Sequence, residues 1–129
     1  MAETRPEPIL GEEETRAFLE GVAQFNAGFF FECHDTLEDV WMGVRGPSRD
    51  FFQGLIQVAV AFHHLTSGNP AGAESLLGRA LKRFHGYPDR YFGLDLAAHR
   101  RELEGWLAAI RSGAPAATPL EALPKWRFE

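Results

Sequence analysis

Apolar residues recur at helical spacing in five segments of this chain, and no segment alternates between apolar and polar residues at period two. The expected helices cover residues 12–25, 29–44, 49–67, 70–84 and 96–112. Three residues are expected to cap the helices that follow them: Ser48, Asn69, which precedes Pro70, and Asp95. We therefore predict an all-α fold, a compact bundle of about five helices with no sheet.

The helix expected over 49–67 has apolar residues on nearly every side, which is typical of a central, buried helix. We expect Leu55 and Ile56 to be fully buried. A weak internal repeat accompanies this pattern, because Phe25, Gly28, Leu37 and Trp41 recur forty residues later as Leu65, Gly68, Leu77 and Leu81. The repeat predicts a bundle built from stacked helical hairpins.

The length of 129 residues suits a single domain. Residues 1–11 are interpreted as a flexible N-terminal arm, 12–113 as one helical domain, and 114–129 as a tail rich in proline and alanine. The tail is expected to lie outside the core, so its deletion should leave the domain folded. The tail residues that could instead dock on the body are Leu120, Leu123, Trp126 and Phe128.

Composition excludes several classes of protein. Hydrophobic residues make up 45% of the chain, which argues against disorder, and a net charge of −5 argues against a nucleic-acid partner. No signal peptide or membrane-spanning segment is expected. Cys33 is the only cysteine, so an intramolecular disulfide and a cysteine-based zinc site are excluded. We expect a soluble cytoplasmic protein in which Cys33 is buried and inert, although it lies near a helix N-terminus.

Polar residues interrupt two otherwise apolar helix faces. His34 lies on the apolar face of the second expected helix, with Glu38 one turn further on. Because buried polar groups need partners, we predict that these two residues face a polar stripe of the third helix. The full set of candidate ligand-binding residues is Glu32, His34, Glu38, Arg49, Gln53, Gln57 and His64.

Two interpretations of this polar cluster remain open. An internal network that fixes the register of the second and third helices is the simpler one. The other is a ligand site, either for a small polar molecule held by arginine and glutamine or for a divalent metal bound by His34, Asp35, Glu38 and His64. The metal signal is weak, because HDxxE lacks the second histidine of a metalloprotease HExxH helix. No cofactor is predicted.

Four blocks of the sequence carry a family resemblance. They read FNAGFFFECHDTLEDVW, RDFFQGLIQVAVAFHH, GNPAGAESLLGRAL and GLD, and they span residues 25–96 in order. Together they resemble the domain-of-unknown-function family 309 of small helical bacterial and archaeal proteins. The resemblance implies a compact, all-helical cytoplasmic domain and no established activity. At Asp35 this chain carries a carboxylate one methylene shorter than the glutamate of the family pattern.

No strong catalytic motif occurs in the sequence, so whether the protein is an enzyme stays open. We predict a non-catalytic binding or self-association module with a polar cluster between the second and third helices. The alternative is a small metal-dependent enzyme or ligand sensor that uses the same cluster. The expected partner is another protein or a second copy of the chain in a homodimer, with a small polar ligand as the alternative; nucleic acid and membrane are not expected.

Overall fold

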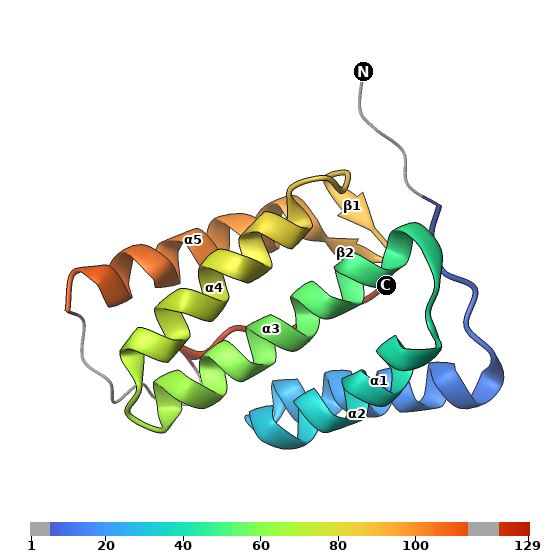
Figure 1. Ribbon diagram of the computed structural model, residues 1–129, viewed down its shortest axis with the longest axis horizontal. Helices are drawn as coiled ribbons and strands as arrows, with labels where there is room; N and C mark the ends of the chain where they lie inside the picture. Colours follow the sequence, from blue (N-terminus) through green and yellow to red (C-terminus); the bar gives the residue numbers. More distant parts are fainter. Residues whose placement is uncertain (1–5, 114–121) are drawn as a thin grey trace.

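The computed structural model describes residues 6–113 and 122–129, and five helices account for most of them (Figure 1). They are α1 (Glu12–Asn26), α2 (Phe30–Gly43), α3 (Arg49–Thr66), α4 (Pro70–Phe84) and α5 (Leu96–Arg111), with a 3-10 turn, η1 (Gly46–Ser48), before α3. The predicted all-α class is confirmed, and each helix ends within one residue of its predicted bounds.

The prediction of no sheet is wrong at one place. The aromatic loop between α4 and α5 contains two short antiparallel strands, β1 (Arg90–Tyr91) and β2 (Leu94–Asp95). The two residues of their turn, Phe92 and Gly93, both have positive φ, at 51° and 83°, as a tight hairpin turn requires. A side chain on Gly93 would collide with the backbone of Glu129, which passes directly against it.

Two of the three predicted caps are confirmed. The side chain of Asn69 accepts a hydrogen bond from the Gly72 N–H at 3.1 Å, and that of Asp95 accepts one from the Ala98 N–H at 3.0 Å. The third is wrong, because Ser48 makes no side-chain cap. Its φ of −81° and ψ of −10° are already helical, since η1 leads directly into α3, whereas a capping residue has extended backbone geometry.

The predicted hairpins are present. The chain reverses after α1 and after α3 at Gly28 and Gly68, whose φ angles are 85° and 82°. In both reversals the residue after the glycine donates a backbone hydrogen bond back to the helix that has just ended. The Phe29 N–H donates to the Gln24 carbonyl, and the Asn69 N–H donates to the His64 carbonyl. Each helix then packs against the next, and α3 lies between α2 and α4 (Figure 1). Helix α3 is central, as predicted.

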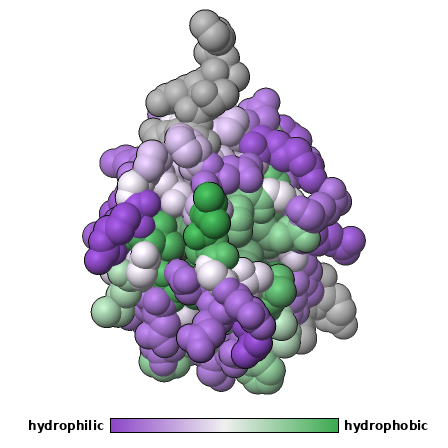
Figure 2. Space-filling model, turned by 90° about the vertical axis from the view of Figure 1, so that its right-hand side faces the viewer, coloured by the Kyte–Doolittle hydropathy of each residue, from purple (hydrophilic) through white to green (hydrophobic). Residues whose placement is uncertain are grey.

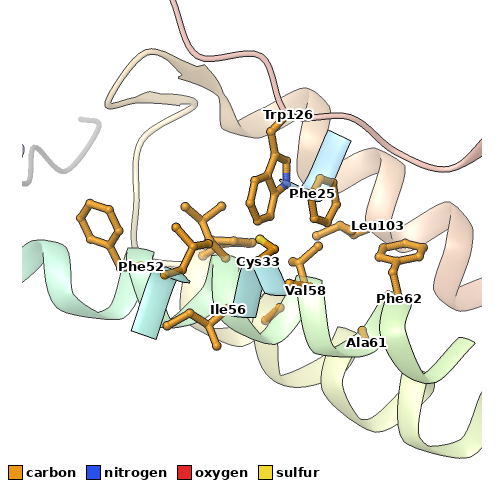
Figure 3. Packing of buried hydrophobic residues seen from close by; sticks show 14 of the residues in the cluster. Phe25, Cys33, Phe52, Ile56, Val58, Ala61, Phe62, Leu103 and Trp126 are labelled. Atoms are coloured by element: carbon orange, nitrogen blue, oxygen red, sulfur yellow. The ribbon is translucent and has the colours of Figure 1, made fainter. Parts of the chain in front are cut away.

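The core forms around the apolar side of α3 (Figure 3). Leu55 is completely buried and Ile56 is 7% exposed, close to the prediction of full burial for both. Aromatic rings fill much of the interior, and they come from all of α1 to α4, from the hairpin between α4 and α5, and from the C-terminal segment. The largest fully buried aromatic side chains are Phe25, Phe51, Phe52, Phe62, Phe84, Tyr91 and Trp126.

The C-terminal segment is part of this core, so the expectation that it lies outside is wrong for residues 122–129. Leu123 and Trp126 are buried, and Phe128 packs against the cluster. The Asn26 amide of α1 donates to the Trp126 carbonyl at 2.9 Å and accepts from its N–H at 2.7 Å. The segment therefore completes the core, with partners on both α1 and α5. Leu120 lies outside the described residues.

Two residues of the N-terminal arm contact the hairpin. The Tyr91 hydroxyl donates to the Pro6 carbonyl at 2.6 Å, and the Phe92 N–H donates to the Glu7 carboxylate at 2.8 Å. Figure 2 shows the right-hand end of the molecule, where a patch of apolar surface is surrounded by hydrophilic residues. Among the helices of the described ranges, none combines the length and apolar character needed to cross a bilayer.

Candidate functional site

The polar stripe of α3 lies along the open side of that helix. Its members Arg49, Gln53, Gln57, Val60 and His64 are all half-buried, whereas the opposite side of α3 is fully buried in the core. Since α2 and α4 flank α3, the stripe faces solvent between them. It therefore borders two neighbouring helices, and not only α2 as the sequence suggested.

Arg49 stabilises the connection between α2 and α3. Its guanidinium carbon lies 3.9 Å from the centre of the Trp41 ring, a cation–π contact. It also donates to the Trp41 carbonyl at 3.2 Å and to the Val44 carbonyl at 2.8 Å. A cation at the C-terminal end of a helix satisfies carbonyls that lack partners within the helix and complements the helix dipole. Arg49 thus holds the end of α2, and it forms no pair with Glu38.

His34 contacts two carboxylates of its own helix, but its buried Nδ1 has no hydrogen-bond partner. Its Nε2 lies 3.0 Å from the Glu38 carboxylate and its Nδ1 lies 3.5 Å from the Asp35 carboxylate. The two carboxylates therefore lie on opposite sides of the ring, and they do not converge on one point. The fourth proposed metal ligand, His64, is 3.2 Å from the Asn69 amide through its Nδ1. In the described part of the chain no three His, Cys, Asp or Glu side chains form a metal-binding group.

The prediction that the two polar stripes satisfy each other is therefore wrong. In the described residues, no hydrogen bond or ion pair joins His34 or Glu38 to the α3 stripe. The antiparallel neighbours α2 and α3 meet through rings instead, as Phe31 and His63 do with centroids 5.5 Å apart. Glu32 is exposed to solvent.

Gln53 and Gln57 line a groove between α3 and α4. Its volume is about 770 Å³. The lining residues are Asp50, Gln53, Gln57, Arg79, Lys82, Arg83, His85 and Gly86. Asp50 is paired with Arg83 at 2.7 Å, which leaves two cations, Arg79 and Lys82, without an ion pair among the described residues. The Gln57 side-chain oxygen is buried without a hydrogen-bond partner. The groove is positively charged although the whole chain carries −5.

A second groove, of about 480 Å³, adjoins the first and shares Arg79 and Lys82 with it. It lies between α4 and the end of α5, where Arg111 and Glu74 pair at 3.2 Å. Arg79 and Lys82 therefore lie on α4 between the two grooves and border both of them. The candidate residues predicted from the sequence include none of Arg79, Lys82 and Arg83. Their spacing at i, i+3 and i+4 on one side of a helix was the available signal.

Cys33 is buried, and burial raises the pKa of its thiol from 9.0 to about 12, despite a weaker opposing effect of a backbone hydrogen bond involving Phe25. Only the thiolate is a strong nucleophile. The expectation of an inert cysteine is consistent with this environment.

Comparison with known proteins agrees with the family resemblance. Residues 18–76 match the family model described as "Domain of unknown function (DUF309)". This match confirms the resemblance seen in the sequence. The matched DUF309 region contains most of α1, all of α2 and α3, and the first half of α4.

Two curated relatives are similar over parts of their length. An uncharacterized protein of Aquifex aeolicus (strain VF5) is 30% identical over 103 residues, which are 79% of this chain and 31% of the relative. The uncharacterized protein YpuF of Bacillus subtilis (strain 168) is 33% identical over 69 residues, which are 52% of this chain and 40% of that protein. The chain thus spans less than half the length of either relative.

Proposed function

We propose that this chain is a non-catalytic binding module of the cytoplasm that takes an acidic protein surface into the groove between α3 and α4. The observation that carries the proposal is the pair of cations Arg79 and Lys82, which have no ion-pair partner among the described residues and stand at a groove of about 770 Å³. Gln53 and Gln57 add amide groups to its α3 side. Cys33 as the sole cysteine suits a reducing compartment.

The chemistry of the groove favours carboxylates. A guanidinium binds a carboxylate through two parallel hydrogen bonds, and an ammonium adds a mobile point charge. Glutamine side chains donate through their amide nitrogen. Because Arg79 and Lys82 are both exposed, a single ion pair here would contribute about 0–1 kcal/mol. Useful affinity therefore requires a partner that offers several carboxylates at once, together with apolar contacts at the edges.

The arrangement of the other polar groups supports a binding role over catalysis. Arg49 closes the end of α2, and His34 is held between carboxylates of its own helix. The one cysteine is buried with a raised pKa. None of these groups lines the groove; among its lining residues Asp50 is paired with Arg83, and His85 is the side chain that could act as a general acid or base within reach of a bound molecule.

The test measures binding of an acetylated, fluorescein-labelled hexaglutamate peptide by fluorescence anisotropy at low ionic strength. The native chain should bind, and the variant Arg79→Glu/Lys82→Glu should lose at least about tenfold in affinity because the cations become anions. The control is Arg101→Glu/Arg127→Glu, which reverses two exposed arginines outside both grooves and so changes the net charge by the same amount. Equal loss in the control would show that net charge alone governs binding, and no binding by the native chain would refute the proposal.

A further inference from the structure

We propose that the acidic surface received by the groove is helix α2 of a second copy of this chain, so that two copies form a symmetric dimer. This inference rests on the proposed function of the groove and names its partner. The contacting surface of α2 is the row Phe31, Asp35, Glu38 and Met42, called here the α2 ridge. Its counterpart is the α3–α4 groove with Arg79, Lys82 and Arg83.

The α2 ridge has the composition of an interface row. Its four residues are spaced at i, i+4, i+7 and i+11, so they lie along one side of the helix. The middle is acidic and the two ends are apolar, with Phe31 52% exposed and Met42 63% exposed. These are the exposed large hydrophobic side chains within α2 itself. The acidic centre of the ridge is complementary in charge to the groove, which is lined by cations and half-buried glutamines.

The acidic residues of the ridge and the cations of the groove lie between the same two levels along α3. At one end of α3, Arg49 contacts Trp41 of α2, and the neighbouring Asp50 pairs with Arg83 of α4. At the other end, His63 contacts Phe31 of α2, and the neighbouring His64 lies against Gly72 of α4.

Helices α2 and α4 therefore both run opposite to α3 and parallel to each other. Asp35 and Glu38 lie between the two levels on α2, and Arg79 and Lys82 lie between the same two levels on α4.

This arrangement is self-complementary under one two-fold rotation. Suppose that the axis lies in the contact plane and parallel to α3. The rotation then leaves the position along α3 unchanged, and it places α2 of one copy opposite α4 of the other. The α2 ridge of one copy then lies opposite the α3–α4 groove of the other, and the same contact occurs twice. Closed two-fold dimers with such isologous contacts are the commonest form of homo-oligomer. Rotation about the perpendicular in-plane axis would instead set acidic α2 against acidic α2.

The first measurement is the molar mass of the native chain by sedimentation equilibrium across a range of protein and salt concentrations. A dimer is expected, and it should weaken as salt rises because exposed charges are screened. A chain that stays monomeric up to about 1 mM, the weak end of measurable association, would overturn the inference.

Charge reversal then tests the pairing itself. Asp35→Lys/Glu38→Lys makes both surfaces basic, and Arg79→Glu/Lys82→Glu makes both acidic, so each variant alone should be monomeric. An equimolar mixture should form a one-to-one heterodimer, because each contact again joins opposite charges. A single chain carrying all four substitutions should dimerise with itself. Arg101→Glu/Arg127→Glu, which changes the net charge as much as Arg79→Glu/Lys82→Glu but at exposed residues outside both surfaces, is the matched control and should remain dimeric.

The outcomes separate the dimer from the groove's binding role. A mixture that stays monomeric, or single-surface variants that still dimerise, would overturn the proposed pairing. If the native chain is monomeric yet binds hexaglutamate through Arg79 and Lys82, the groove binds acidic partners and the second copy is not one of them. Circular dichroism of each variant should match the native chain, because all four reversed residues are exposed.

Discussion

The indole of Trp126 lies flat on the ring of Phe25, with centroids 3.8 Å apart and ring planes 2° from parallel. The contact joins two residues 101 positions apart. The Trp126 indole N–H also lies 3.2 Å from Nε2 of the buried His99 on α5, so one side chain connects the first helix to the last. The C-terminal segment thereby closes the bundle on the side of α3 opposite the α3–α4 groove.

Trp126→Ala should therefore destabilise the fold by about 3–5 kcal/mol, because it removes a large buried ring and leaves a cavity. Urea denaturation followed by circular dichroism gives the free energy of unfolding. The adjacent Arg127→Ala is the control, since Arg127 is exposed and should change stability by no more than about 0.5 kcal/mol. Equal, small effects for both variants would mean that the segment leaves the core in solution.

Arg49→Ala should cost about 1–3 kcal/mol through loss of the cation–π contact with Trp41 and of the hydrogen bonds to the end of α2. Arg49→Lys should recover only part of this, because an ammonium cannot stack its plane on the indole. Chemical denaturation measures both variants. If lysine restored full stability, charge near the helix end would account for the whole effect.

Two glycines within helices offer a matched pair. At Gly54 of α3 an added Cβ would lie 2.5 Å from the Phe84 ring, so Gly54→Ala should destabilise by about 1–3 kcal/mol through overpacking. At Gly78 of α4 an added Cβ would meet no atom within 4 Å, so Gly78→Ala should stabilise by about 0.5–1 kcal/mol. Thermal unfolding of the two variants should shift in opposite directions. A shift in the same direction would show that α3 and α4 pack less closely than the structure indicates.

The Cys33 thiol should resist Ellman's reagent at pH 8 in the native protein and react once urea unfolds the chain, because its pKa is raised from 9.0 to about 12 by burial. The shift also links stability to pH. Between about pH 9 and 12 the unfolded thiol loses its proton while the folded one keeps it, so its contribution to stability is complete below pH 9 and falls as pH rises. Cys33→Ala should show a shallower loss over that range. Rapid reaction of the native thiol would contradict its burial.

The local parts of this structure were predictable from the sequence. Asn69 before Pro70 begins α4, and Asp95 begins α5, because capping involves only the residues within one turn. Gly28 and Gly68 end helices for an equally local reason, the low cost of positive φ at glycine. The predicted cap at Ser48 was wrong, because the residue type at a capping position does not show whether a 3-10 turn precedes the helix.

The candidate site was only partly predictable. The stripe of Gln53, Gln57 and His64 was found from its helical spacing, but spacing does not tell which neighbour a helix face borders. The neighbour proved to be α4 as much as α2, which brings Arg79 and Lys82 beside the glutamines.

The sequence by itself determined five helices, their ends, the central place of α3 and the presence of polar residues on its open side. These features depend on backbone preferences and on the periodic burial of apolar side chains, which act over a few residues. Only the tertiary structure decided that Trp126 stacks on Phe25, that Arg49 belongs to the end of α2, and that the groove lies against α4. Those contacts join residues up to 101 positions apart, and they depend on how whole helices pack, which no short stretch of sequence specifies.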